Sequence, residues 1–272
     1  MKYCLVLAGW FAALAGWAQT PTIGARAAGL GYAAVTVRDA GALFANISGV
    51  AHVKRPSLWA GYENRFGFSE GLHAVAAGFV QPTRYGTGSV SIYRFGDTYY
   101  SQHRLSLGLS HQIDQFSVGV RLSQHQYHIE SFGTRFRTVL DIGGQAQLSP
   151  KIVLGMQLLN ITQASLSDEG REKIPTFIQV GVSCRLASSW QLNTEIEHEL
   201  TQRPNAKLGV EYTALQKFSL RSGFNSTELR QFFGLSWKHR LLIADYALSS
   251  HSRLGWSHQV ALTYHLSRQR DE

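Results

Sequence analysis

The sequence has almost no cysteine and, beyond its first residues, no long run of apolar side chains. Cys4 lies inside an export signal, so the exported chain keeps Cys184 alone and forms no internal disulfide. Without a stretch of about 20 apolar residues after that signal, a membrane-spanning helix is excluded. The basic residues form no dense run, and we expect no nucleic-acid partner.

The first residues predict a signal peptide over residues 1–18. Lys2 gives the positive start, residues 5–14 the apolar stretch, and residues 16–18 a small-residue cleavage site before Gln19. Cys4 lies too early for a lipid anchor at the end of such a signal, so we expect cleavage and export.

The exported chain carries a positive charge. The net charge is +8 for the whole sequence, and +7 without Lys2, with 25 basic and 18 acidic residues. Together with the export signal, this excess predicts contact with an anionic outer leaflet. The expected surroundings are therefore outer-membrane lipid and lipopolysaccharide.

What the sequence does contain is alternation with a period of two. In residues 190–200, Trp190, Leu192 and Ile196 fall on one side, and Gln191 and Glu195 fall on the other. Successive side chains of a strand point to opposite faces, so one face meets an apolar environment and the other a wet one. Repeated along the chain behind an export signal, this pattern predicts a transmembrane antiparallel β-barrel in the outer membrane of a Gram-negative envelope.

Turn residues divide the alternating region into about fourteen strands, most of them near the 9–11 residues that a tilted strand needs to cross a bilayer. The even number suits bacterial single-chain barrels, and twelve would suit them too. The predicted ranges are 57–66, 71–81, 86–96, 99–113, 115–128, 134–148, 151–163, 175–187, 190–201, 205–214, 217–225, 229–239, 241–249 and 255–266.

The two faces of these strands differ in the way a membrane barrel requires. The outward phase is apolar, as in the run Leu105, Leu107 and Leu109, and it includes Cys184. The inward phase carries charges of both signs, which a dry soluble core would not tolerate. A soluble β-sandwich or lipocalin-like barrel also alternates, but its apolar face fills a core. The inward charged residues are Glu63, Arg65, Arg104, Arg121, Asp141, Glu195, Glu197, Glu211, Arg221, Arg230, Lys238 and Asp245.

Residues 19–53 differ from the strands and predict a plug in the lumen, which leaves residues 54–272 for the barrel. The segment is rich in Gly and Ala, which suit close packing inside another structure, and Asp39 is a good N-cap for a short helix. We expect Arg26 and Asp39 to dock onto lumen charges; the alternative is that these charges are solvated without specific partners. The candidate plug–lumen contacts are Arg26, Asp39, Asn46, Glu63, Glu211, Arg221 and Asp245.

Three further patterns are weighed against catalysis and cofactor binding. Residues 29–34 fit a dinucleotide fingerprint but follow a signal junction, so a plug turn is the better interpretation. His125 and His128, three apart in a strand, face opposite sides and cannot share a metal ion; they are interpreted as polar strand-end residues. Ser219, Ser236 and Ser257 face inward, whereas His258 falls in the outward phase and therefore cannot act as the base for its neighbour Ser257. We therefore expect no enzyme activity, no metal and no cofactor.

Several segments resemble the PorV/PorQ family. Residues 24–31 (GARAAGLG) and 42–51 (ALFANISGVA) resemble the start of that family, where Asn46 and Gly49 fit its Asn-Pro-Ala-Gly and Ile47 replaces the proline. In the second half, residues 155–161, 208–212, 220–225, 245–248 and 254–262 resemble family motifs in order, with residues 174–175 and Gly181 between them.

The resemblance implies a fold like that of the FadL-type transporters, with fourteen strands and an N-terminal plug. It implies a non-enzymatic accessory subunit of the type IX secretion system of Bacteroidetes, a partner of the translocon or of the surface-attachment complex. The turns depart from the family because they are short, the longest obvious one being residues 167–173.

The alternative function is a FadL-like conduit for hydrophobic small molecules. It predicts an apolar pocket at the plug, to which Leu43, Phe44, Ile47 and Val50 would contribute unless they merely pack against Trp59 and Phe232. Packing is favoured, because polar partners that would orient a ligand are not obvious from the sequence.

Overall fold

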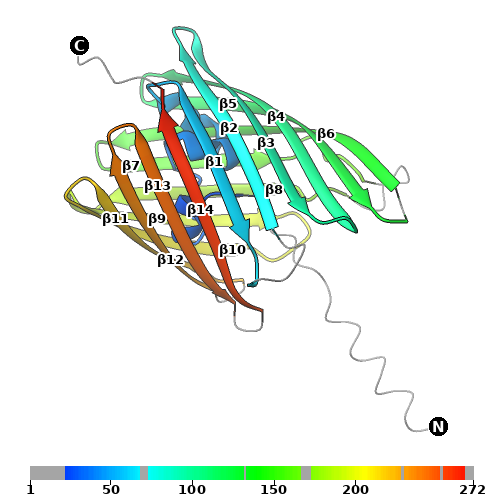
Figure 1. The fold of residues 1–272 in the computed structure, drawn as a ribbon. Helices are drawn as coiled ribbons and strands as arrows, with labels where there is room; N and C mark the ends of the chain where they lie inside the picture. The colour runs from blue at the N-terminus through cyan, green and yellow to red at the C-terminus, as the bar shows by residue number, and fades with distance from the viewer. Residues whose placement is uncertain are drawn as a thin grey trace.

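The computed structural model describes residues 22–67, 73–131, 133–166, 173–227, 230–251 and 254–266. In this part of the chain, fourteen strands form one closed antiparallel barrel in sequence order, with β1 pairing with β14 (Figure 1). The predicted barrel is confirmed. The strands are β1 Ser57–Asn64, β2 His73–Thr83, β3 Gly86–Gly96, β4 Tyr100–Ile113, β5 Phe116–Ile129, β6 Gly133–Ser149, β7 Ile152–Leu159, β8 Phe177–Arg185, β9 Trp190–Glu199, β10 Asn205–Ala214, β11 Phe218–Asn225, β12 Arg230–His239, β13 Leu242–His251 and β14 Gly255–His265.

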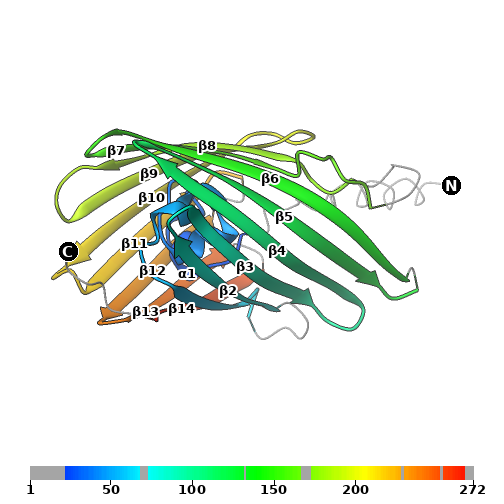
Figure 2. The ribbon, with the colours of Figure 1, turned by 90° about the horizontal axis from the view of Figure 1, so that it is seen from above.

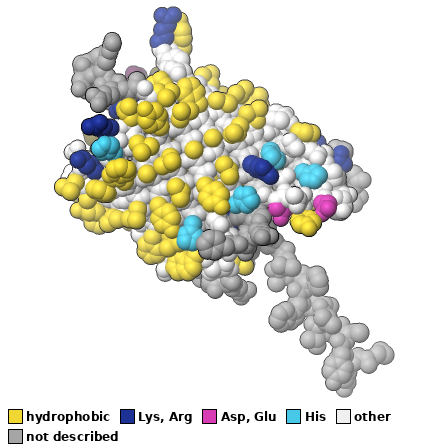
Figure 3. Space-filling model, in the orientation of Figure 1, with side chains coloured by type: hydrophobic (Ala, Val, Ile, Leu, Met, Phe, Trp, Pro, Cys, Tyr) yellow, Lys and Arg dark blue, Asp and Glu magenta, His cyan; other side chains and the backbone are white. Residues whose placement is uncertain are grey.

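The outside of the barrel is apolar along the strands, as the alternation predicts. Leu105, Leu107 and Leu109 of β4 are exposed, and hydrophobic side chains, in yellow, are spread over the face drawn in Figure 3. Closure gives every strand a hydrogen-bonded neighbour on both sides, as the absence of water in a bilayer requires. A closed barrel with this exterior is an outer-membrane protein. No helix among the described residues is long and apolar enough to span a membrane.

The two ends of the barrel have connections of different length. At one end, β2–β3, β4–β5, β6–β7 and β12–β13 are joined by two-residue turns, and β1 begins and β14 finishes there. At the other end, residues 160–176 form the longest connection, and β4, β5 and β6 extend farthest (Figure 2). Outer-membrane barrels have short periplasmic turns and longer extracellular loops. We call the short-turn end the inner end and the other the outer end.

Residues 22–53 lie inside the barrel and form the plug. Short helices α1 (Ala25–Gly29), η2 (Ala40–Phe44) and η3 (Ile47–His52) follow one another in the lumen, where Figure 2 shows them enclosed by the strands. Asp39 caps η2 by accepting a hydrogen bond from the Gly41 amide, so the helix predicted at Asp39 is present as a 3-10 helix. The predicted signal peptide, residues 1–18, lies outside the described residues.

The plug packs its apolar side chains against β1, β2 and their neighbours. Leu43, Phe44 and Ile47 are buried in one cluster with Trp59, and the rings of Phe44 and Trp59 lie 4.8 Å apart. Phe232 packs against Tyr32 instead, with ring centroids 5.5 Å apart, so the expected contact between Phe232 and residues 43–50 is replaced by one nearer α1. The plug and one side of the barrel wall therefore share an apolar core.

Candidate functional site

The barrel wall has glycines where the backbone or a side chain of the plug approaches it closely. A Cβ atom added at Gly209 would lie 2.5 Å from the carbonyl oxygen of Leu30, and one at Gly155 would lie 2.6 Å from that of Val35. Only glycine leaves room for such an approach. We call this set the wall glycines; they come from nine strands and are Gly78, Gly108, Gly119, Gly143, Gly155, Gly181, Gly209, Gly223 and Gly234.

Polar side chains of the wall hold the plug backbone between these glycines. The Glu195 carboxylate accepts hydrogen bonds from the amides of Ala34 and Val35, both at 2.8 Å, and Lys207 pairs with it at 2.9 Å. Arg121 donates to the carbonyl oxygen of Leu43 at 2.6 Å. Buried polar groups need such partners, so wall and plug satisfy each other inside the barrel.

Five of the seven candidate contact residues meet in one network on the inner side of the plug. Arg26 pairs with Asp39 at 2.6 Å and with Glu211 at 3.2 Å. Arg221 pairs with Glu211 at 2.8 Å and with Asp245 at 2.7 Å. Two guanidinium groups therefore serve three carboxylates, and the network ties α1 to β10, β11 and β13. Its part in retaining the plug stays a prediction.

The remaining two candidates lie elsewhere. Glu63 pairs with Arg65 just beyond its own strand, at 3.0 Å, and not with Arg26 or Asp39. Asn46 lies at the start of η3, where its amide donates to the carbonyl oxygens of Val35 and Met156, at 2.8 and 3.2 Å. It links two turns of the plug to β7, a backbone contact that charge matching would not reveal.

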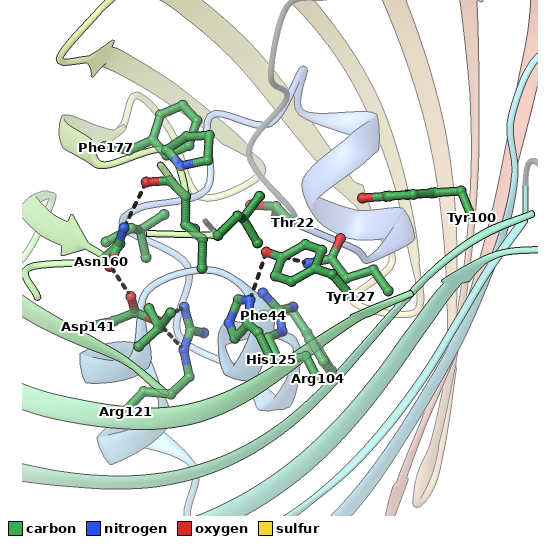
Figure 4. Close-up of a pocket in the computed structure, with 16 residues that line it drawn as sticks. Thr22, Phe44, Tyr100, Arg104, Arg121, His125, Tyr127, Asp141, Asn160 and Phe177 are labelled. Atoms are coloured by element: carbon green, nitrogen blue, oxygen red, sulfur yellow. Dashed lines mark hydrogen bonds and ion pairs between the residues drawn. The ribbon is translucent and has the colours of Figure 1, made fainter. Parts of the chain in front are cut away.

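On the outer side of the plug lies a cavity of about 280 Å³, which we call the outer cavity (Figure 4). Its wall comes from the plug, from β4 to β8 and from the connection between β7 and β8. The lining residues are Thr22, Phe44, Tyr100, Gln102, Arg104, Arg121, His125, Tyr127, Val139, Asp141, Leu159, Asn160, Leu166, Ile174, Pro175 and Phe177. For comparison, an engineered apolar cavity of about 150 Å³ holds benzene.

Asp141 organises the polar side of the outer cavity. One carboxylate oxygen accepts from Arg121 at 2.8 Å, and the other accepts from the backbone amide of Asn160 at 2.8 Å. Asn160, with φ of 54°, donates to the carbonyl oxygen of Ile174 at 2.8 Å and accepts from Ala164 at 3.0 Å. These bonds join Asn160 to Ala164 and Ile174 in the described parts of the connection and hold Ile174 at the cavity.

A second polar group faces the cavity from β4 and β5. The hydroxyl of Tyr127 lies 3.1 Å from Nδ1 of His125 and accepts from Gln102 at 3.2 Å. His128 lies on the opposite face, as the spacing predicts. His125, however, is buried in the lumen with 5% of its surface exposed, and is not merely a polar strand-end residue.

Two histidines of β14 bond hydroxyl groups of neighbouring strands. No group of three or more His, Cys, Asp or Glu side chains there could hold a metal ion. His258 bonds the Tyr246 hydroxyl, which lies on the outward face. Ser57 lies 2.8 Å from His265, but its hydroxyl donates to the Arg55 carbonyl, so this pair joins strand ends.

The sequence does mark some of the site residues that are absent from the seven candidate contacts. Glycine in the interior of a strand marks close approach of another backbone or a ligand, and nine strands carry one facing the plug. Arg104, Arg121 and Asp141 belong to the inward phase. The aromatic and amide residues of the outer cavity have no comparable signal, because only the fold brings them together.

No family model matches the sequence, and no curated protein matches it significantly. Among solved structures, a monoaromatic hydrocarbon channel, CymD, has a TM-score of 0.73 at 11% identity, covering 93% of this chain and 100% of its own. The toluene transporter TodX of P. putida has a TM-score of 0.64 at 12% identity, with 93% and 100% covered. At these identities the likeness establishes the fold.

Proposed function

We propose that this chain is an outer-membrane channel for small molecules with an apolar, ring-sized body. The observation that carries the proposal is the outer cavity, which lies between the outer end and the plug and has aromatic walls from Phe44, Tyr127 and Phe177. Binding pockets are largely apolar clefts with a few placed polar groups, and this cavity has both features. The likeness to two hydrocarbon channels supports the same function.

The polar lining favours a ligand with an acceptor or anionic group at one end of its apolar body. Arg104 and Arg121 line the cavity, and the carboxylate among its described lining residues is that of Asp141. The guanidinium of Arg104 lies 4.9 Å from the ring centroid of Tyr93, and Arg121 is fixed by Asp141. A carboxylate or phenol oxygen is the complement of such donors. The polar partners that sequence reasoning found lacking are therefore present, contributed by the wall.

The test is ligand binding by the purified protein in detergent, measured by calorimetry with toluene and benzoate. Val139→Trp fills the cavity from β6, and we expect it to weaken binding at least tenfold. The matched control is Val118→Trp on the lipid-facing side of β5, which should change nothing. Phe177→Ala enlarges the cavity as a second variant. Equal binding by wild type and Val139→Trp would overturn the proposal.

A second candidate function is a non-enzymatic accessory subunit of type IX protein secretion, a partner of the translocon or of the surface-attachment complex. The resemblance to PorV/PorQ segments favours it, and so does the close fit of the plug to the wall glycines, which suits a sealed barrel. Affinity capture from detergent-solubilised outer membrane, with mass spectrometry of proteins and lipids, separates the two functions. Recovery with a giant barrel or attachment proteins supports secretion; recovery alone with a small apolar molecule supports the channel.

A further inference from the structure

The inner end of the lumen carries a strong excess of positive charge. A cavity of about 400 Å³ lies there, and its described lining includes seven Arg and Lys side chains and three acidic ones. A second cavity of about 170 Å³ shares Arg26 and Arg38 with the first, and no acidic residue is among its described lining. We call the two together the inner mouth. Its cationic residues are Arg26, Arg38, Lys54, Arg55, Lys151, Arg185, Lys217, Arg221 and Lys238.

The acidic side chains that line the inner mouth already form ion pairs within the protein. Asp39, Glu211 and Asp245 each pair with Arg26 or Arg221 in the network described above. Lys54, Lys217 and Lys238 are exposed and make no ion pair with any described acidic side chain, and the same holds for Lys151 and Arg185. Their charge is therefore not neutralised within this part of the chain.

Arg38 links the two cavities and lacks an acidic partner in the described residues. It donates to the amide oxygen of Gln145 at 2.9 Å and to that of Gln147, both neutral groups, while its Nη2 atom is buried without a hydrogen-bond partner. Nearby His52 responds to the same field: burial, then the charges of Arg38 and Lys54, lower its pKa to about 4. An unsatisfied buried donor in a positive field is a place for an anionic acceptor.

We infer that the inner mouth binds an acidic peptide segment presented from the periplasm, a segment rich in Asp and Glu. The cations come from the plug, the link between the plug and β1, the β6–β7 and β10–β11 turns, β8, β11 and β12. A single small anion contacts two or three such groups, whereas an extended chain of carboxylates matches all of them. This inference does not rest on the proposed channel function.

A lipid headgroup fits the arrangement less well. The positive side chains line the lumen cavities, whereas Leu148, Leu186 and Leu215, near the same end, are outward-facing or in turns and are strongly exposed. The bilayer therefore meets leucine at this end, and the charges face the opening of the lumen. Complementary charge of this kind speeds encounter and selects the partner.

The experiment is a titration of a fluorescein-labelled decaglutamate peptide with the full-length protein in non-ionic detergent, read by fluorescence anisotropy. The test variant carries Lys54→Gln, Lys217→Gln and Lys238→Gln; all three side chains are exposed, so the barrel should fold. The control carries Arg94→Gln, Lys173→Gln and Arg203→Gln, which remove the same charge from exposed positions nearer the outer end. Heat-modifiable gel mobility checks folding of both.

We expect the decaglutamate peptide to bind and the inner-mouth variant to weaken binding about tenfold, because three exposed ion pairs are lost. The control variant should bind like wild type, a decaglutamine peptide should not bind, and raising the salt from about 0.05 to about 0.5 M should weaken binding. Three results would overturn the inference: no binding, equal loss in both variants, or displacement of the peptide by inorganic phosphate at an equal concentration of charge.

Discussion

The two ends of the lumen are built from the same alternating strands, yet they differ in what they offer a ligand. The outer cavity has aromatic and aliphatic walls, and its Arg121 is neutralised by Asp141. The inner mouth has a larger volume and is cationic, and its acidic side chains already pair with Arg26 and Arg221. The plug lies between them. The inward phase of a strand therefore fixes where a side chain points, while its cross-strand and plug neighbours decide which site it makes.

The largest expected effect comes from breaking the network that anchors the plug. Arg221→Ala would leave the carboxylates of Glu211 and Asp245 buried with fewer partners, at a cost of about 3–5 kcal/mol to the seated plug. Protease resistance of residues 22–53 and heat-modifiable mobility measure it, with Arg203→Ala in the β9–β10 loop as control. Unchanged resistance would mean that the network does not retain the plug.

The next largest effect is expected from a steric clash that pushes the plug away from the wall between the two ends of the lumen. Gly223→Val places a side chain against the backbone of Gly31, and we expect a cost of about 1–3 kcal/mol and a rise in conductance across planar bilayers. Gly88→Val is the matched control, because nothing lies within 4 Å of a Cβ atom added there. Equal conductance of the two variants would show that the wall glycines do not seal the lumen.

A smaller effect is expected from a substitution that leaves positive charge in the outer cavity unbalanced, as it is in the inner mouth. Asp141→Asn keeps an oxygen to accept from the Asn160 amide but removes the charge that balances Arg121. The ratio of benzoate to toluene affinity should rise about three- to tenfold, since an anion gains a less neutralised partner. Calorimetry with both ligands measures the ratio, and Asp97→Asn at the β3–β4 turn is the control. A constant ratio would show that the charge of the outer cavity does not determine which ligand is preferred.

The smallest effect reports the field of the inner mouth. The pKa of His52 is about 4 in the folded chain and about 6.5 when unfolded, so the folded chain binds fewer protons between these values. Seating of the plug should weaken as the pH falls from about 6.5 to about 4. An NMR titration of the His52 ring should give the lowered value, and Arg38→Gln should raise it. An Arg38→Gln variant with the same His52 pKa as wild type would contradict the positive field, because burial also lowers this pKa.

Among the site residues, the sequence predicted types and faces better than partners. The inward phase identified Glu211, Arg221 and Asp245, and the plug charges Arg26 and Asp39, which the structure brings together. Glu63 was grouped with them because charge alone does not specify distance; it pairs with Arg65 instead. Asn46 was a candidate because it fits a family motif. Its partners could not be predicted, because the carbonyl oxygens that it contacts are common to every residue type.

The sequence by itself determined the strands, their faces and the closed barrel, because a period of two is local and lipid on one side must meet apolar side chains. It also marked the plug, whose small residues suit a crowded lumen. Only the tertiary structure decided that Asp141, Tyr127 and Phe44 form one cavity, and that Lys54, Lys217 and Lys238 surround another. These side chains meet through strand register and the path of the plug, which join residues far apart in the chain.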